Sequence, residues 1–99
     1  MEIEVTQEDI DKGVSDISNE CAVALALRRK FKTNRVVVLV NHAKTIRDNE
    51  HTLTFKVRDK LYKEKHIDKL DHVRNFILDF DRGVDVVIPF KFSLNLNNN

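Results

Sequence analysis

The chain has 99 residues, of which 41% are hydrophobic and 33% are charged, a composition and length typical of one domain with one modest core. The 17 basic and 16 acidic residues leave a formal net charge of only +1, which excludes a disordered polyelectrolyte or a histone-like arm. One cysteine excludes an internal disulfide, and two glycines and one proline exclude nucleotide-binding designs built on glycine-rich loops.

No apolar run approaches the roughly 20 residues of a membrane span. The acidic start, Met1 to Val5, lacks the apolar region of a secretion signal. A single cysteine also fits a reducing compartment. We therefore expect a cytoplasmic location and no contact with a membrane.

The beginning of the chain predicts a strand followed by a short helix. Ile3 and Val5 alternate with glutamates, a pattern typical of a half-buried strand. Thr6, with Asp9 three residues later, resembles a helix N-cap with an acidic first turn. We expect this helix to end at Gly13 in the left-handed conformation.

The next helix is expected to be capped by Asp16 or Ser18 and to contain the run 21–27, which is apolar on every face and so predicts burial all round. Cys21 begins that run and is the only thiol. A helix start lowers a thiol pKa, but an apolar setting favours a buried, inert cysteine over a nucleophile.

Three strands are expected in the middle of the chain. The β-branched run 36–40 predicts a central strand covered on both faces. A weaker strand is expected over 41–47, around Ile46, followed by a turn at 48–49. Alternation over 52–58 predicts a strand with one wet, basic face.

A polar loop or frayed helical turn is expected over 59–69, and an amphipathic helix from about Asp68 to Gly83. The last strand is expected over 86–96, with Pro89 at a sheet edge or at a break in the strand. The inward residues expected on these elements are Leu70, Val73, Phe76, Ile77 and Phe80, and then Val86, Ile88, Phe90, Phe92, Leu94 and Leu96.

The expected order is therefore β-α-α-β-β-β-α-β. Consecutive strands with short turns form an antiparallel meander, so we expect an α+β fold with one antiparallel sheet and helices packed on one face. A single domain is expected over residues 1–96, with 97–99 as a frayed tail.

Two groups of motifs resemble a family of small phage-encoded proteins of unknown function. They lie within residues 5–27 and 73–94 and comprise Val5-Thr6, Glu8-Asp9-Ile10, Gly13, Cys21-Ala22-Val23-Ala24-Leu25-Ala26-Leu27, Val73, Phe76-Ile77, Phe80-Asp81, Gly83 and Pro89-Phe90-Lys91-Phe92-Ser93-Leu94. Ala22 stands where the family usually has proline. The resemblance implies a shared fold and an origin in a phage, hence a location in an infected bacterial cell. It implies no catalytic or binding residue.

Candidate catalytic and metal-binding groups are few. Asp68 and His72 are four residues apart on one expected helix, but no Cys-x-x-Cys or His-Glu-x-x-His pattern accompanies them. Two carboxylate pairs, each two residues apart, do not face each other on a helix. These pairs are Asp9 with Asp11 and Asp79 with Asp81. We therefore expect no enzyme, no metal site and no cofactor.

The distribution of charge is the most informative feature. Residues 28–66 contain twelve basic and four acidic residues, a net charge of +8, whereas residues 1–27 have a net charge of −6. Solvation of exposed strands and loops accounts for part of this excess. The alternative is a binding surface in the 52–66 segment. Its candidate partner-binding residues are Lys56, Arg58, Lys60, Tyr62, Lys63 and Lys65.

Three functions remain open at this point. The first is a small phage-type accessory protein that binds an acidic surface of a host protein and inhibits a host factor or a defence component. The second is a nucleic-acid-binding module that uses residues 52–66, with Tyr62 as its one exposed stacking aromatic. The third is sequestration of a small nucleotide in an arginine-rich pocket.

Overall fold

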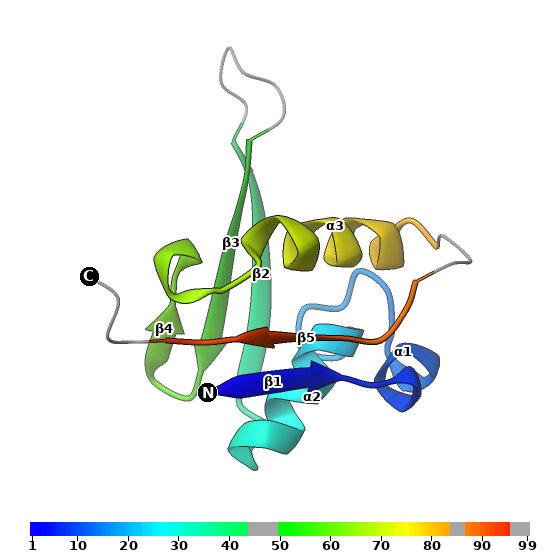
Figure 1. Ribbon diagram of the computed structural model, residues 1–99, viewed down its shortest axis with the longest axis horizontal. Helices are drawn as coiled ribbons and strands as arrows, with labels where there is room; N and C mark the ends of the chain where they lie inside the picture. Colours follow the sequence, from blue (N-terminus) through cyan, green and yellow to red (C-terminus); the bar gives the residue numbers. More distant parts are fainter. Residues whose placement is uncertain (44–49, 84–86, 96–99) are drawn as a thin grey trace.

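Two antiparallel sheets form the framework of the domain, instead of the one sheet expected. The computed structural model describes residues 1–43, 50–83 and 87–95. Sheet order is β2-β3-β4 in one sheet and β1-β5 in the other. The strands are β1 (Glu2–Val5), β2 (Val36–Ala43), β3 (Glu50–Val57), β4 (Lys60–Tyr62) and β5 (Phe90–Ser93). In Figure 1 the β1–β5 ribbon crosses in front of the three-stranded sheet.

Helices complete an α+β fold, as expected. They are α1 (Gln7–Lys12), α2 (Ala22–Phe31) and α3 (Leu70–Asp81), with a short 3-10 helix, η1 (Glu64–His66). Helix α2 packs against β1 and β2, and α3 runs alongside β5 (Figure 1). The Cα radius of gyration is 12.8 Å, close to the roughly 13 Å of a compact domain of this length.

The two sheets meet through aromatic side chains. Phe55 of β3 and Phe92 of β5 are 0% and 1% exposed, and their ring centroids lie 5.9 Å apart. Helix α3 adds its apolar stripe to this core, because Phe76 lies 4.7 Å from Phe90, also measured between ring centroids. The buried residues of α3 are Val73, Phe76, Ile77 and Phe80, which confirms the inward face expected for this helix.

One face of the three-stranded sheet remains open to solvent. Val36 and Val38 of β2 are buried, whereas Leu39 on the other face is 39% exposed. The expectation that the run 36–40 is covered on both faces is therefore wrong. The continuous apolar run suggested that other elements cover both faces of this strand. The helices and the β1–β5 ribbon instead all pack on the face that carries Val36 and Val38.

The meander has a different third strand from the one expected. Strand β2 continues through Ala43 and no separate strand begins at 41, while Ile46 and the turn at 48–49 lie outside the described residues. The third strand is β4, inside the 59–69 segment expected to be a loop or a frayed turn. A strand of three residues within a lysine-rich segment gives almost no periodic signal, and such short strands are typical of sheet edges.

Helix ends agree with expectation at Thr6 but not at the second helix. The Thr6 hydroxyl accepts a hydrogen bond from the Asp9 amide at 3.2 Å, and the Asp9 carboxylate accepts one from the Thr6 amide at 2.9 Å. Helix α2 begins after Cys21, so neither Asp16 nor Ser18 caps it.

Gly13 ends α1 for a reason other than the one expected. Its φ of −66° is ordinary for any residue, so the expected left-handed conformation is wrong. Space explains the glycine instead, since a Cβ here would lie 2.7 Å from the Asp9 carbonyl oxygen and 2.8 Å from the Ala22 nitrogen. Gly83 after α3 does adopt the left-handed conformation, with φ of 71°.

The last strand is shorter than its sequence pattern. Only residues 90–93 pair with β1, and Pro89 precedes them without a ladder partner. Ile88, expected to face inward, is 62% exposed, while Val87 packs against the core. Alternation therefore changes phase at Pro89, which has no amide hydrogen to donate. Val86, Leu96 and the tail 97–99 lie outside the described residues.

The beginning of β1 and the end of β5 are joined directly. The Met1 amino group donates to the Leu94 carbonyl at 3.1 Å, and the Leu94 amide donates to the Met1 carbonyl at 2.8 Å. Leu94 also forms an isolated bridge with Ile67. The ribbon is thus tied at one end to the segment that leads into α3.

Candidate interaction surface

The six residues expected to bind a partner do not form one surface. Strand alternation places Phe55 and Val57 inward, 0% and 3% exposed, and Lys56 outward. In the ladder, Lys56 lies opposite Leu61, and Val57 lies opposite Lys60. Opposed residues share a face, so Lys56 and Lys60 start on opposite faces of the sheet.

Arg58 turns away from Lys56 and contacts the end of α2. It has a φ of 55° and follows the last residue of β3. Its amide donates to the Arg35 carbonyl at 2.8 Å, and its guanidinium donates to the Phe31 carbonyl at 3.2 Å. A cation that bonds a carbonyl at a helix C-terminus stabilises that end of the helix. The expectation that Arg58 extends the face of Lys56 is therefore wrong.

Tyr62 belongs to the core. It is 4% exposed, and its ring centroid lies 5.7 Å from that of Phe31. Burial raises the pKa of its phenol. The ladder pairs Tyr62 with Phe55, which points inward, so Tyr62 must point inward too. The expectation that Tyr62 is an exposed stacking aromatic is therefore wrong.

The remaining lysines lie around β4 and η1. Lys60, Lys63 and Lys65 are all exposed. Lys60 borders a hollow of about 240 Å³ that reaches Phe31 and Tyr62. Between Lys63 and Lys65, Glu64 turns the other way and accepts from Arg74 of α3 at 2.7 Å.

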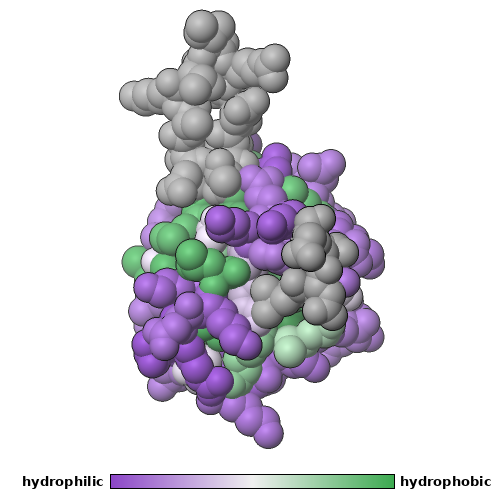
Figure 2. All heavy atoms as spheres, turned by 90° about the vertical axis from the view of Figure 1, so that its left-hand side faces the viewer, coloured by the Kyte–Doolittle hydropathy of each residue, from purple (hydrophilic) through white to green (hydrophobic). Residues whose placement is uncertain are grey.

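Apolar side chains gather on the open face of the three-stranded sheet. Val37, Lys56 and Leu61 form one cross-strand row, since Lys56 is paired with both of the others. Leu39 and Thr54 form the adjacent row. Leu39 is 39% and Leu61 47% exposed. Figure 2, which views the side on which β4 lies, shows hydrophobic surface among hydrophilic side chains. We call Val37, Leu39, Thr54, Lys56 and Leu61 the outer face.

The outer face was not among the sequence-based candidates. Its signal was present in part, because Leu61 between Lys60 and Tyr62 has the period of a strand. The part of the outer face on β2 could not be recognised, since a strand that is apolar at every position does not indicate that one of its faces is exposed.

Cys21 is not placed for nucleophilic chemistry. Its side chain is 5% exposed, and burial raises its thiol pKa, an effect to which the nearby charge of Asp81 adds. A thiol needs a lowered pKa to attack at neutral pH. This agrees with the expected buried, inert side chain.

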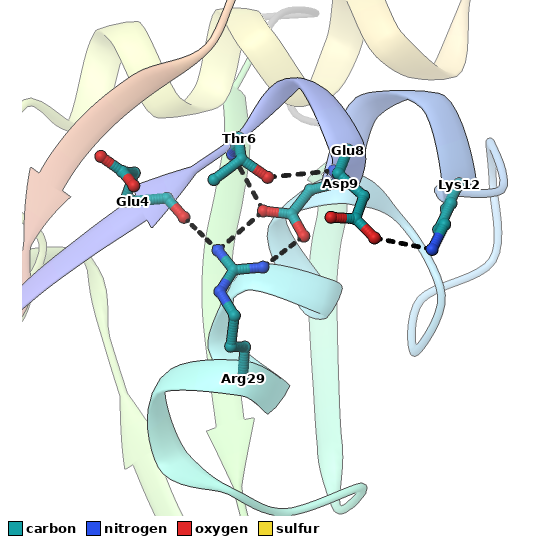
Figure 3. Close-up of polar contacts among 6 residues, drawn as sticks. All are labelled: Glu4, Thr6, Glu8, Asp9, Lys12 and Arg29. Atoms are coloured by element: carbon teal, nitrogen blue, oxygen red, sulfur yellow. Dashed lines mark hydrogen bonds and ion pairs between the residues drawn. The ribbon is translucent and has the colours of Figure 1, made fainter.

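The most buried charge in the described part of the chain is the Asp9 carboxylate, 4% exposed. Figure 3 shows Arg29 reaching from α2 to both Asp9 oxygens and to the Glu4 carbonyl, which it contacts at 2.7 Å. Burial acts to raise the Asp9 pKa, but hydrogen bonds from Arg29 and Thr6 outweigh it, and the pKa lies below its usual value. This pair joins β1, α1 and α2, and its bonding groups are occupied by the fold itself.

No three histidine, cysteine, aspartate or glutamate side chains come together to hold a metal ion within residues 1–40, 53–83 and 87–95. His72, which lies four residues after Asp68, packs its ring on that of Phe90, with ring centroids 4.8 Å apart. His66 accepts a hydrogen bond from the Lys63 amide at 3.0 Å. No helix within the described ranges is long and apolar enough to cross a membrane.

Comparisons of this chain with models of protein families, with curated proteins and with solved structures found no match.

Proposed function

We propose that this domain is a protein-binding module, and that its outer face docks on an acidic surface of another protein. The observation that carries the proposal is the row in which Lys56 lies between Val37 and Leu61. Burial of the aliphatic side chains in an interface would favour binding by about 25 cal/mol per Å² of apolar surface removed from water. The lysine between them selects a partner with a carboxylate at the matching place.

Charge around the outer face supports an acidic partner. No ion pair joins Lys56 or Lys63 to another residue in the part of the chain that the structure describes. These ammonium groups would speed the approach of an acidic surface, because charges at the rim of an interface act mainly on the association rate. If the resemblance to phage proteins holds, the partner is a host protein, and binding would inhibit a host factor or a defence component.

Nucleic acid is the less favoured partner. Base stacking needs an exposed aromatic, and Tyr62, the candidate for that role, is 4% exposed. Sequestration of a nucleotide is also less favoured, since the hollow beside α2 combines Arg29, Lys30 and Lys32 with Glu2 and Glu4.

A capture experiment with matched variants tests the proposal. The immobilised protein is exposed to bacterial lysate with and without nuclease, alongside the double variant Lys56→Glu, Leu61→Ser. The control is Lys30→Glu, which makes the same charge change on α2, where Lys30 is exposed. We expect a protein that wild type and control retain despite nuclease and that the double variant loses.

Two outcomes contradict the proposal. Equal retention by the double variant would mean that the outer face is only a solvated surface. Retention that disappears with nuclease, and binding to random DNA that weakens steeply with salt, would favour nucleic acid. Thermal unfolding of both variants should stay close to wild type, because exposed charges and an exposed leucine contribute little to stability.

A further inference from the structure

The free edge of β2 has unpaired backbone groups. The Val38 amide donates to the Ser18 carbonyl at 2.7 Å, so it points away from β3. Val38 lies opposite Phe55 and Val40 opposite Leu53 in an unbroken register. Because hydrogen-bonding direction alternates along an antiparallel strand, the Val40 N–H and C=O also point away from β3. The Leu53 amide agrees, since it donates in the opposite direction, to Glu64 at 3.4 Å.

The loop before α2 occupies this edge at Val38 but not at Val40. Ser18 pairs with Val38, and among residues 1–43, 50–83 and 87–95 no turn, loop or inter-element hydrogen bond reaches the Val40 backbone. An unpaired strand edge is a template on which another strand can form.

A cleft of about 260 Å³ lies beside that edge. Its walls are β2, the loop before α2 and the second half of α3. The apolar lining includes Ile17, which is 41% exposed, together with Val40, Ile77 and Leu78. An added strand alternates its side chains, so one side chain of the incoming segment would enter this cleft while its backbone pairs with Val40.

The loop wall of the cleft is fixed in place. The Ser15 hydroxyl donates to the Phe80 carbonyl at 2.9 Å, and the Asp16 amide donates to the Asp81 carboxylate at 3.0 Å. Both bonds tie the loop to the last turn of α3. A preformed wall lowers the entropic cost of binding.

Charge at the cleft is negative. Asp16 and Asp81 are its ionisable carboxylates, and no lysine or arginine among the described residues lines it. A basic residue beside the entering apolar side chain would meet these carboxylates. This is opposite to the charge that suits the outer face, so the two surfaces select different partner groups.

We infer that the β2 edge and its cleft bind an extended segment of another protein as an added strand, with an aliphatic side chain in the cleft and a lysine or arginine beside Asp16 and Asp81. Backbone pairing supplies affinity in this mode of recognition, and alternate side chains supply specificity. Leu39 lines the cleft as well as belonging to the outer face, but the inference depends on neither Lys56 nor Leu61, which carry the proposal for the outer face.

Synthetic peptides test the inference by nuclear magnetic resonance of the ¹⁵N-labelled protein. The probe peptide alternates valine with threonine and has one central lysine. One comparison peptide replaces the lysine with glutamate, and another is N-methylated at the residues that would pair. We expect the lysine peptide to shift the Val40 amide signal and slow its hydrogen exchange. It should bind roughly five- to tenfold more tightly than the glutamate peptide, as one exposed carboxylate, Asp16, and one half-buried carboxylate, Asp81, allow.

Protein variants separate this site from the outer face. Asp16→Asn with Asp81→Asn keeps the shape of both side chains and should abolish the preference for lysine over glutamate. Lys56→Glu should leave peptide binding unchanged. An unshifted Val40 amide, equal binding of the two peptides, or undiminished binding of the N-methylated peptide would each overturn the inference. None of these outcomes depends on whether the outer face binds a protein.

Discussion

Arg29 holds the buried carboxylate of Asp9 through both of its terminal nitrogens, at 2.6 and 2.9 Å. Asp9 is also the residue that bonds the amide of Thr6 at the start of α1. One carboxylate therefore fixes a helix start and the contact between α1 and α2.

Removal of this charge should destabilise the fold. Asp9→Asn should lower the free energy of unfolding by about 2–4 kcal/mol, because the buried carboxylate charge loses its contact with the half-exposed Arg29 guanidinium and part of a helix cap is lost. Urea unfolding near neutral pH measures it. Asp11→Asn is the matched control, since Asp11 is exposed and accepts only from Gln7. Equal losses in the two variants would contradict a special role for Asp9.

The same carboxylate predicts a pH dependence. The Asp9 pKa in the folded protein lies below the usual 3.8, so its stabilisation is complete above that value and is lost as pH falls through the folded pKa. We therefore expect wild type to lose more stability in acid than Asp9→Asn does, with the difference developing below about pH 4. Urea unfolding of both proteins, measured side by side at a series of decreasing pH values, would show whether their free energies of unfolding converge in acid.

Glycine substitutions should differ in cost and in cause. Gly13→Ala places a Cβ 2.7 Å from a carbonyl oxygen and 2.9 Å from the Phe80 ring, so we expect a loss of roughly 1–3 kcal/mol from overpacking. Gly83→Ala meets no atom within 4 Å but must keep a φ of 71°, which costs about 1 kcal/mol. Thermal denaturation ranks them, and a harmless Gly13→Ala would refute the crowding argument.

Core substitutions should follow burial rather than residue type. Phe55→Ala and Phe92→Ala remove rings that are 0% and 1% exposed, and each should cost about 3–5 kcal/mol. Phe90→Ala should cost less, because that ring is only half-buried. Ile88→Ala should be nearly neutral, since this side chain is 62% exposed. Chemical denaturation gives all four values, and a large loss at Ile88 would contradict the change of phase at Pro89.

The thiol provides a probe of unfolding. Cys21 is 5% exposed and its pKa is raised by burial, so a thiol reagent should label the native protein slowly and the denatured protein completely. Rapid stoichiometric labelling under native conditions would show that the start of α2 opens readily.

Local patterns predicted much of the fold. The cap at Thr6, the buried run of α2 and the inward stripe of α3 are set by neighbours within a few residues, so the sequence carried their signal. The second sheet was missed because Glu2–Val5 pairs with residues at the other end of the chain. Sequence periodicity indicates that a strand has one buried face. It does not indicate which other strand pairs with it or which segment covers that face.

The candidate site was the harder problem for the same reason. Charge density along residues 52–66 suggested one basic surface, but charge density does not record on which face a side chain lies. Cross-strand register decides that Tyr62 points inward with Phe55 and that Leu61 points outward with Lys56. Register depended on β4, a strand too short for its pattern to be recognised.

The direct bond between Met1 and Leu94 spans 93 positions of sequence. During synthesis, β1 therefore has no strand partner until β5 has been made. Contacts of such long sequence separation are closed late and slow the folding of small domains. Until β5 arrives, the apolar side chains of Ile3 and Val5 lack one of their covers. Synthesis therefore leaves the apolar side chains of β1 without this cover, and accessible to chaperones, while the segments from α1 to α3 are made.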